Sequence, residues 1–144
     1  MAYLWATHRH VDPQVIWLLS IGGFLITGAA NTLNQILERD SDRLMKRTAV
    51  RPLPCNRMTN REALLFAAIL ATAGFATLSA INMLCSFTGL LALLLYAGVY
   101  TPMKKKSPLA VVPGAIAGSL PVVIGCVAAN GEITSEALIL FLIQ

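Results

Sequence analysis

The side chains best suited to chemistry are three that recur every fourth residue at the end of a long apolar run: Asn34, Glu38 and Asp42. Residues four apart lie on one side of an α-helix, so this spacing puts an amide and two carboxylates on a single face. At 100° per residue, Asn31 and Gln35 join that face, which then spans an arc of about 100°. Carboxylates at a membrane boundary are costly and are usually paired or functional, so we treat this polar face as a candidate site.

Oxygen ligands at this spacing suit Mg²⁺, which binds through one or two carboxylates and completes its shell with water and phosphate oxygens. Basic residues follow at once, among them Arg43, Arg47 and Arg51. A metal ion alone would repel them, whereas a phosphorylated ligand would lie favourably between the metal and the guanidinium groups. The alternative is that Glu38 and Asp42 pair with Lys46 or Arg43 on a solvated helix end. That reading leaves the alignment of the three amides with the two acids unexplained.

The elements that carry this face are predicted to span a membrane. The chain is 56% hydrophobic and 12% charged, with a mean hydropathy of +0.69. A spanning helix needs about 20 apolar residues, and the sequence has long runs without charge. These runs predict an all-α, polytopic transmembrane helical bundle with four spans and part of a fifth. We expect helices at about 13–44, 60–81, 84–101 and 108–129, and another from about 135.

The basic residues predict how the helices are oriented. Ten of the 11 Lys and Arg residues fall within 39–61 or 104–106, and only Arg9 is expected at the opposite side. Two spans separate the two clusters, so both belong on one membrane face, which the positive-inside rule makes cytoplasmic. The loops at 38–62 and 104–107 are therefore expected in the cytoplasm. The net charge of +4 describes one cationic face and does not indicate a nucleic-acid partner.

Two segments carry a family resemblance. Asn34-xxx-Glu38-xxx-Asp42 resembles the first acidic motif, N-xxx-D/E-xxx-D, of the intramembrane prenyltransferases of the UbiA superfamily. The string "NQILERDSDRLMKRTAVRPLP" is similar in particular to the branch of this superfamily that farnesylates protohaem IX to give haem O. A second match, "YTPMKKKSPLAVVPGAIAGSLPVVIG", includes Tyr100 and the Lys104-Lys105 pair. The resemblance covers nearly the whole chain.

The resemblance implies a fold of about nine spans, with two acidic motifs facing each other across a central cavity. Residues 1–144 resemble spans two to five, so we expect a partial UbiA-like domain without the first span and the C-terminal half. Such a piece is expected to be inactive alone. The implied location is the bacterial cytoplasmic membrane, as a multi-pass protein.

The resemblance also implies roles for individual residues. Asn34, Glu38 and Asp42 would form the catalytic centre and hold Mg²⁺ against the diphosphate of farnesyl diphosphate. Asn31 and Tyr100 would line the cavity, and haem b would be the acceptor. Other membrane enzymes of the haem pathway would be partners, together with the lipid bilayer. The diphosphate oxygens would be bound by basic side chains, of which Arg47 and Arg51 are the weaker candidates: Arg43, Arg47, Arg51, Lys104 and Lys105.

Other functions stay open from the sequence. The acceptor could be a quinone or a chlorophyll, since its identity rests on the resemblance alone. A transporter or channel could conduct a cation along the polar face, and a non-catalytic assembly module would also fit. The lysines at 104–106 could simply flank a span on its cytoplasmic side. An arginine-rich loop beside the acids favours the diphosphate site over the channel.

Overall fold

The computed structural model describes residues 2–7 and 11–144, and within these residues every regular element is helical. Arg9, expected on the side opposite the other basic residues, lies outside this range. The all-α prediction is confirmed, and four helical segments are long and apolar enough to cross a membrane. The elements, in chain order, are α1 (Ala2–Ala6), α2 (Pro13–Leu44), α3 (Asn60–Ser79), α4 (Met83–Leu94), the π-helix η1 (Leu95–Tyr100), α5 (Thr101–Met103), the 3₁₀-helix η2 (Pro108–Ala110), α6 (Val111–Asn130) and α7 (Ser135–Ile143).

Local capping sets the helix limits. Asp12 caps α2 by accepting a hydrogen bond from the Gln14 N–H, with Pro13 in the first turn. Thr59 and Glu62 form a reciprocal capping box at the start of α3. Gly131, at φ +77°, ends α6 in the left-handed conformation that glycine adopts without cost. The limits predicted from the sequence are therefore confirmed to within two residues.

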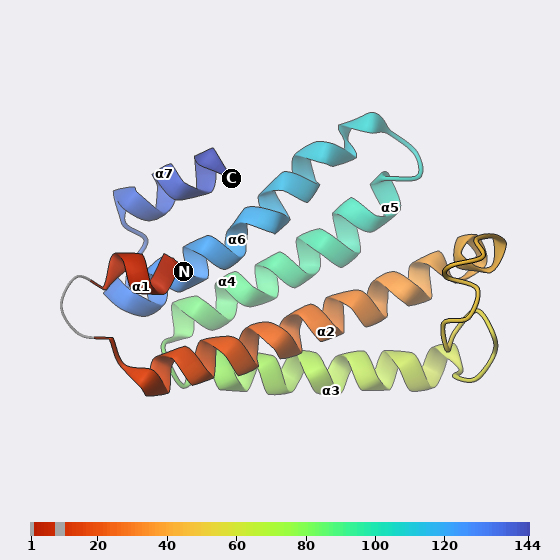
Figure 1. Ribbon diagram of the computed structural model, residues 1–144, viewed down its shortest axis with the longest axis horizontal. Helices are drawn as coiled ribbons and strands as arrows, with labels where there is room; N and C mark the ends of the chain where they lie inside the picture. The colour runs from red at the N-terminus through yellow and green to blue at the C-terminus, as the bar shows by residue number, and fades with distance from the viewer. Residues whose placement is uncertain (1, 8–10) are drawn as a thin grey trace.

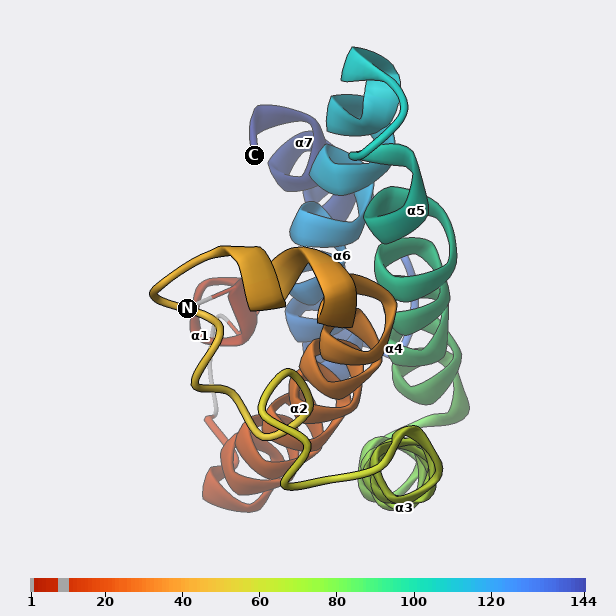
Figure 2. The ribbon, with the colours of Figure 1, turned by 90° about the vertical axis from the view of Figure 1, so that its right-hand side faces the viewer.

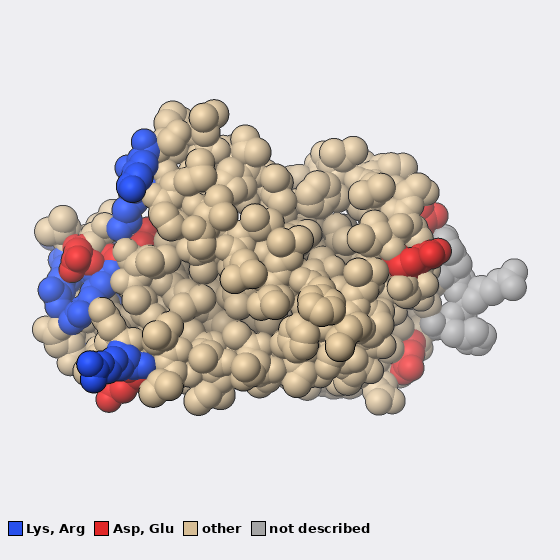
Figure 3. Space-filling model, turned by 180° about the vertical axis from the view of Figure 1, so that it is seen from behind, with Lys and Arg blue, Asp and Glu red and all other residues tan. Residues whose placement is uncertain are grey.

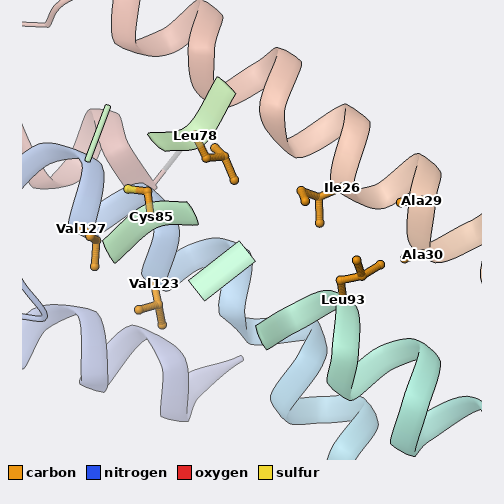
Figure 4. Close-up of a cluster of buried hydrophobic side chains, with 8 residues drawn as sticks. All are labelled: Ile26, Ala29, Ala30, Leu78, Cys85, Leu93, Val123 and Val127. Carbon is orange, nitrogen blue, oxygen red and sulfur yellow. The ribbon is translucent and has the colours of Figure 1, made fainter. Parts of the chain in front are cut away.

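The helices pack as a long antiparallel pair, α2 with α3, beside a second layer of α4 and α6 (Figure 1). Close approach depends on glycine in the first pair, because a Cβ on Gly74 would lie 2.9 Å from the Ile26 side chain. Small residues allow this kind of packing between membrane helices. The buried core joins α2, α3, α4 and α6 (Figure 4), and its residues are Ile26, Ala29, Ala30, Leu78, Cys85, Leu93, Val123 and Val127.

The basic side chains in the described part of the chain lie at one end of the bundle. Figure 3 shows Lys and Arg at this end, and only acidic side chains among the coloured groups at the other. Here α2 ends, α3 begins and the segment from α5 to η2 crosses over (Figure 1). The prediction that the two basic clusters share one side of the bundle is therefore confirmed.

Candidate active site

The amide and carboxylate predicted to share a helix face are in direct contact. Asn34 Nδ2 donates a hydrogen bond of 2.9 Å to Glu38 Oε2, one turn further along α2. The Glu38 side chain is only 14% exposed. This part of the face is therefore covered by other segments and is not a solvated helix end.

The covering segment brings lysines to the acidic face. Lys104 Nζ lies 2.8 Å from Glu38 Oε1 and 5.4 Å from the centroid of the Tyr100 ring, within the range of a cation–π contact. Lys105 Nζ donates to the Leu37 carbonyl over 3.3 Å. Two of the predicted diphosphate-binding cations thus reach the polar end of α2 from a distant part of the sequence.

Asp42 has a partner from the loop that follows its own helix. Arg51 Nη1 lies 2.8 Å from Asp42 Oδ2, and the Asp42 side chain is 7% exposed. Thr48 Oγ1 donates to the Asp42 carbonyl over 2.9 Å, which holds the start of the loop against the helix end. Neither acid pairs with Lys46 or Arg43, so the partners named in the alternative are wrong, although both acids are ion-paired. Each carboxylate instead takes its cation from a different segment.

Thr101 is a site residue to which sequence reasoning gave no role. Its hydroxyl lies 3.1 Å from Asn34 Oδ1 and 2.8 Å from the Tyr96 carbonyl, and the residue is 1% exposed. It follows the π-helix η1, whose wider turn also directs the Thr101 N–H to the Tyr96 carbonyl. Such π-turns often occur at functional sites. No local sequence pattern marks this turn, so the contact with Asn34 could not have been predicted.

An apolar cavity of about 460 Å³ begins beside this polar cluster, between α2, α4 and α6. Asn31 contributes to its wall, as expected for that residue. Two tyrosines, Tyr3 and Tyr96, line the cavity, whereas the sequence had indicated Tyr100. The Tyr100 ring instead lies against Gly114 of α6 and stacks at a tilt 5.4 Å from the Tyr96 ring. The remaining wall is mostly aliphatic and includes Ile26, Ala30, Leu93, Ala117 and Ile124.

The other predicted cations and Gln35 lie outside this cluster. Arg43 donates to the Pro54 carbonyl over 3.1 Å and to Asn56 Oδ1 over 2.8 Å, so it is bound to the loop. Arg47 is exposed. Gln35 is partly buried beside Asn34. The contact of Arg43 or Arg47 with a diphosphate therefore stays a prediction.

Comparison with known proteins gives the family. Residues 1–144 match the UbiA prenyltransferase family over their whole length. The chain belongs to the UbiA prenyltransferase family. Among UbiA relatives, the chain is 42% identical to a protoheme IX farnesyltransferase of Christiangramia forsetii over 93% of this chain and 45% of the relative. It is 43% identical to a protoheme IX farnesyltransferase of Cytophaga hutchinsonii over 100% of this chain and 51% of the relative.

A solved UbiA structure agrees with the fold. The apo structure of a UbiA homolog from Aeropyrum pernix K1 superposes with a TM-score of 0.78 at 28% identity, covering 96% of this chain and 52% of that one. This UbiA chain thus spans about half the length of the curated relatives it matches. With four spanning helices and UbiA membership, it is a multi-pass membrane protein.

UbiA prenyltransferases generally depend on a divalent metal, and the residues present suit one. Glu38, Asp42 and Asn34 offer carboxylate and amide oxygens, the hard ligands that Mg²⁺ prefers. Each carboxylate already carries one cationic partner. The described residues contain no group of three His, Cys, Asp or Glu side chains that could hold a metal by themselves. These residues thus supply ligand types that suit a divalent metal, while binding of a metal by Glu38 and Asp42 together stays a prediction.

Proposed function

We propose that the full-length protein transfers the farnesyl group of farnesyl diphosphate to a vinyl group of haem b, giving haem O in an Mg²⁺-dependent reaction. One observation carries the proposal. The two carboxylates of α2 each touch a cation from another segment, beside an apolar cavity. Relatives at 42% and 43% identity that are protoheme IX farnesyltransferases support the choice of haem as acceptor.

The diphosphate is proposed to bind beside the Glu38–Lys104 and Asp42–Arg51 ion pairs. Glu38, Asp42 and Asn34 would hold the metal, which supplies positive charge against the diphosphate oxygens. Lys104, Lys105 and Arg51 would donate to the same oxygens, joined by Arg47. Preorganised donors of this kind are worth about 100- to 1,000-fold in rate each when charge develops on a leaving group.

The transfer itself breaks the allylic C–O bond of farnesyl diphosphate, and the bonding electrons leave with the diphosphate. Lys104 and Arg51 would stabilise the charge on that leaving group. The allylic carbon then bonds to a vinyl carbon of haem b, and water adds to the neighbouring carbon with loss of a proton. The cavity beside Asn31 would take the farnesyl chain, since its aliphatic wall keeps water away from the developing cation.

We further propose that the protein lies in the bacterial cytoplasmic membrane with its basic end in the cytoplasm. Ten basic residues at one end of the bundle support this orientation through the positive-inside rule. The diphosphate of farnesyl diphosphate and the metal would then approach from the cytoplasm. Residues 1–144 would form one part of the UbiA domain and carry its first acidic motif.

The test is a product assay in membranes that carry the full-length protein. Farnesyl diphosphate, haem b and Mg²⁺ are supplied, and the haem fraction is separated by chromatography and weighed by mass spectrometry. We expect haem whose mass has increased by one farnesyl group and one hydroxyl group. Farnesylation of a quinone precursor with haem unchanged would contradict the acceptor. Cation flux without diphosphate release would instead support a transporter.

A further inference from the structure

The segment between α2 and α3, residues 45–59, is a compact loop that contacts α2 in two places. Figure 2 shows it folded beside the end of α2. Backbone hydrogen bonds connect its parts, including Cys55 N–H to the Arg51 carbonyl and Arg57 N–H to the Pro52 carbonyl. Leu53, near its centre, is 2% exposed. These backbone bonds connect the part of the loop that holds Arg51 with the part around Leu53 and Arg57.

One end of the loop reaches the acidic face. Thr48 is bonded to the Asp42 carbonyl, and Arg51 pairs with the Asp42 carboxylate at 2.8 Å. The loop thus both covers Asp42 and supplies its cation. The position of Arg51 depends on what holds the rest of the loop.

Two arginines one turn apart on α2 hold the middle of the loop. Arg39 Nε donates to the Leu53 carbonyl over 3.3 Å, and Arg43 Nε donates to the Pro54 carbonyl over 3.1 Å. Arg39 Nη1 also donates to Asn60 Oδ1 over 3.2 Å. Residues four apart share a helix face, so the two planar guanidinium groups hold consecutive carbonyls of the loop.

Asn56 is the acceptor that the two arginines share. Its Oδ1 receives Arg39 Nη2 at 2.6 Å and Arg43 Nη2 at 2.8 Å. The backbone of Asn56 lies at φ +59°, a left-handed conformation that asparagine tolerates better than most residues. The turn at Asn56 thus directs the side chain and the carbonyls of the loop toward the same two guanidinium groups.

We propose that Arg39 and Arg43 are positioning residues that act on the site through Arg51. They hold the loop at Leu53, Pro54 and Asn56, and the loop in turn places Arg51 against Asp42. The inference rests on the proposed function for its effect on catalysis. It assigns Arg43 a role in the loop in place of the direct diphosphate contact predicted from the sequence.

The first test measures hydrogen exchange of the purified full-length protein without substrates. Arg39→Gln and Arg43→Gln should each speed exchange of the amides between 48 and 58. Arg61→Gln is the matched control, because Arg61 is exposed at the same end of the bundle and its side chain makes no hydrogen bond or ion pair with the described residues. Exchange at wild-type rates in both variants would overturn the anchoring. Asn56→Gly keeps the left-handed turn and should speed exchange less than either arginine variant. Asn56→Asp keeps an acceptor for both arginines and should leave exchange at the wild-type rate.

The second test asks whether the anchor acts through Arg51. Farnesyl transfer is the readout. Arg39→Gln should raise the KM for farnesyl diphosphate by roughly 10-fold with a smaller effect on kcat, a loss typical of residues that hold a binding residue in position. In an Arg51→Gln background the same change should add little, because the group that it positions is absent. Full additivity would overturn the proposal. A raised KM in Arg43→Gln with wild-type exchange would show that Arg43 contacts the diphosphate directly. If the wild type transfers no farnesyl group, the proposed function fails, while the exchange data still decide the anchoring.

Discussion

Lys104 Nζ lies 2.8 Å from Glu38 Oε1, so a lysine from the segment after η1 neutralises a carboxylate on α2. The Asp42 carboxylate is met in the same way by Arg51. Charges at the edge of an apolar region are stable only when paired or solvated. The pairs therefore neutralise two acids on the helix whose Asn31 lines the cavity, and their cations could also bind the oxygens of an anionic substrate.

Removing the Lys104 charge should weaken diphosphate binding and leave the Glu38 carboxylate without its ion-pair partner. Lys104→Gln is expected to lower kcat/KM by about 10- to 100-fold, the cost of one charged hydrogen bond. Steady-state farnesyl transfer in membranes measures it. Lys106→Gln removes the same charge from an exposed residue two positions away and should behave as wild type. An equal loss in both variants would mean that general surface charge is what matters.

The Thr101 hydroxyl should fix the orientation of the Asn34 amide. Thr101→Val keeps the shape of the side chain but leaves Asn34 Oδ1 without its hydroxyl partner. We expect a loss of about 0.6–1.7 kcal/mol in the free energy of unfolding, the range for such bonds in membrane helices, and reduced transfer. Thr101→Ser should restore both, measured by denaturation in detergent and by the transfer assay. Equal activity in all three proteins would remove Thr101 from the site.

Gly114 should be required for the position of the Tyr100 ring. A Cβ at Gly114 would lie 2.8 Å from Tyr100 Cδ2 and Cε2, so the ring would have to move away from its place beside Lys104. Gly114→Ala is expected to cost about 1–3 kcal/mol of stability through overpacking and to lower activity. Gly118→Ala is the matched control, because a Cβ there meets nothing within 4 Å. Comparable thermal unfolding of the two variants would contradict this packing.

Local chemistry made most of the fold predictable. Asp12 before Pro13, the Thr59–Glu62 capping box and Gly131 act within a few residues, so the sequence alone indicates where the helices begin and end. The polar face around Asn34 and Glu38 was equally predictable, because helical periodicity alone places the two residues side by side.

The rest of the site depends on distant contacts. The sequence prediction ranked Arg43 above Arg51, whereas Arg51 reaches the acid and Arg43 holds the loop. That difference depends on how residues 45–59 fold back on α2. Tyr96 lines the cavity and Tyr100 does not. This difference depends on the π-helix, which has no local sequence signature.

If Glu38 and Asp42 hold a metal and diphosphate, the release of diphosphate must depend on divalent metal and on both carboxylates. Membranes with the full-length protein are stripped of divalent metal and then titrated with Mg²⁺ in the presence of farnesyl diphosphate and haem b. The variants are Glu38→Gln and Asp42→Asn. The control is Asp40→Asn, which removes an exposed acid from the same segment but off the polar face. We predict that Mg²⁺ restores release in the wild type and in Asp40→Asn, with losses of at least about 100-fold in the other two. Wild-type release and an unchanged Mg²⁺ dependence in Glu38→Gln and Asp42→Asn would contradict the account.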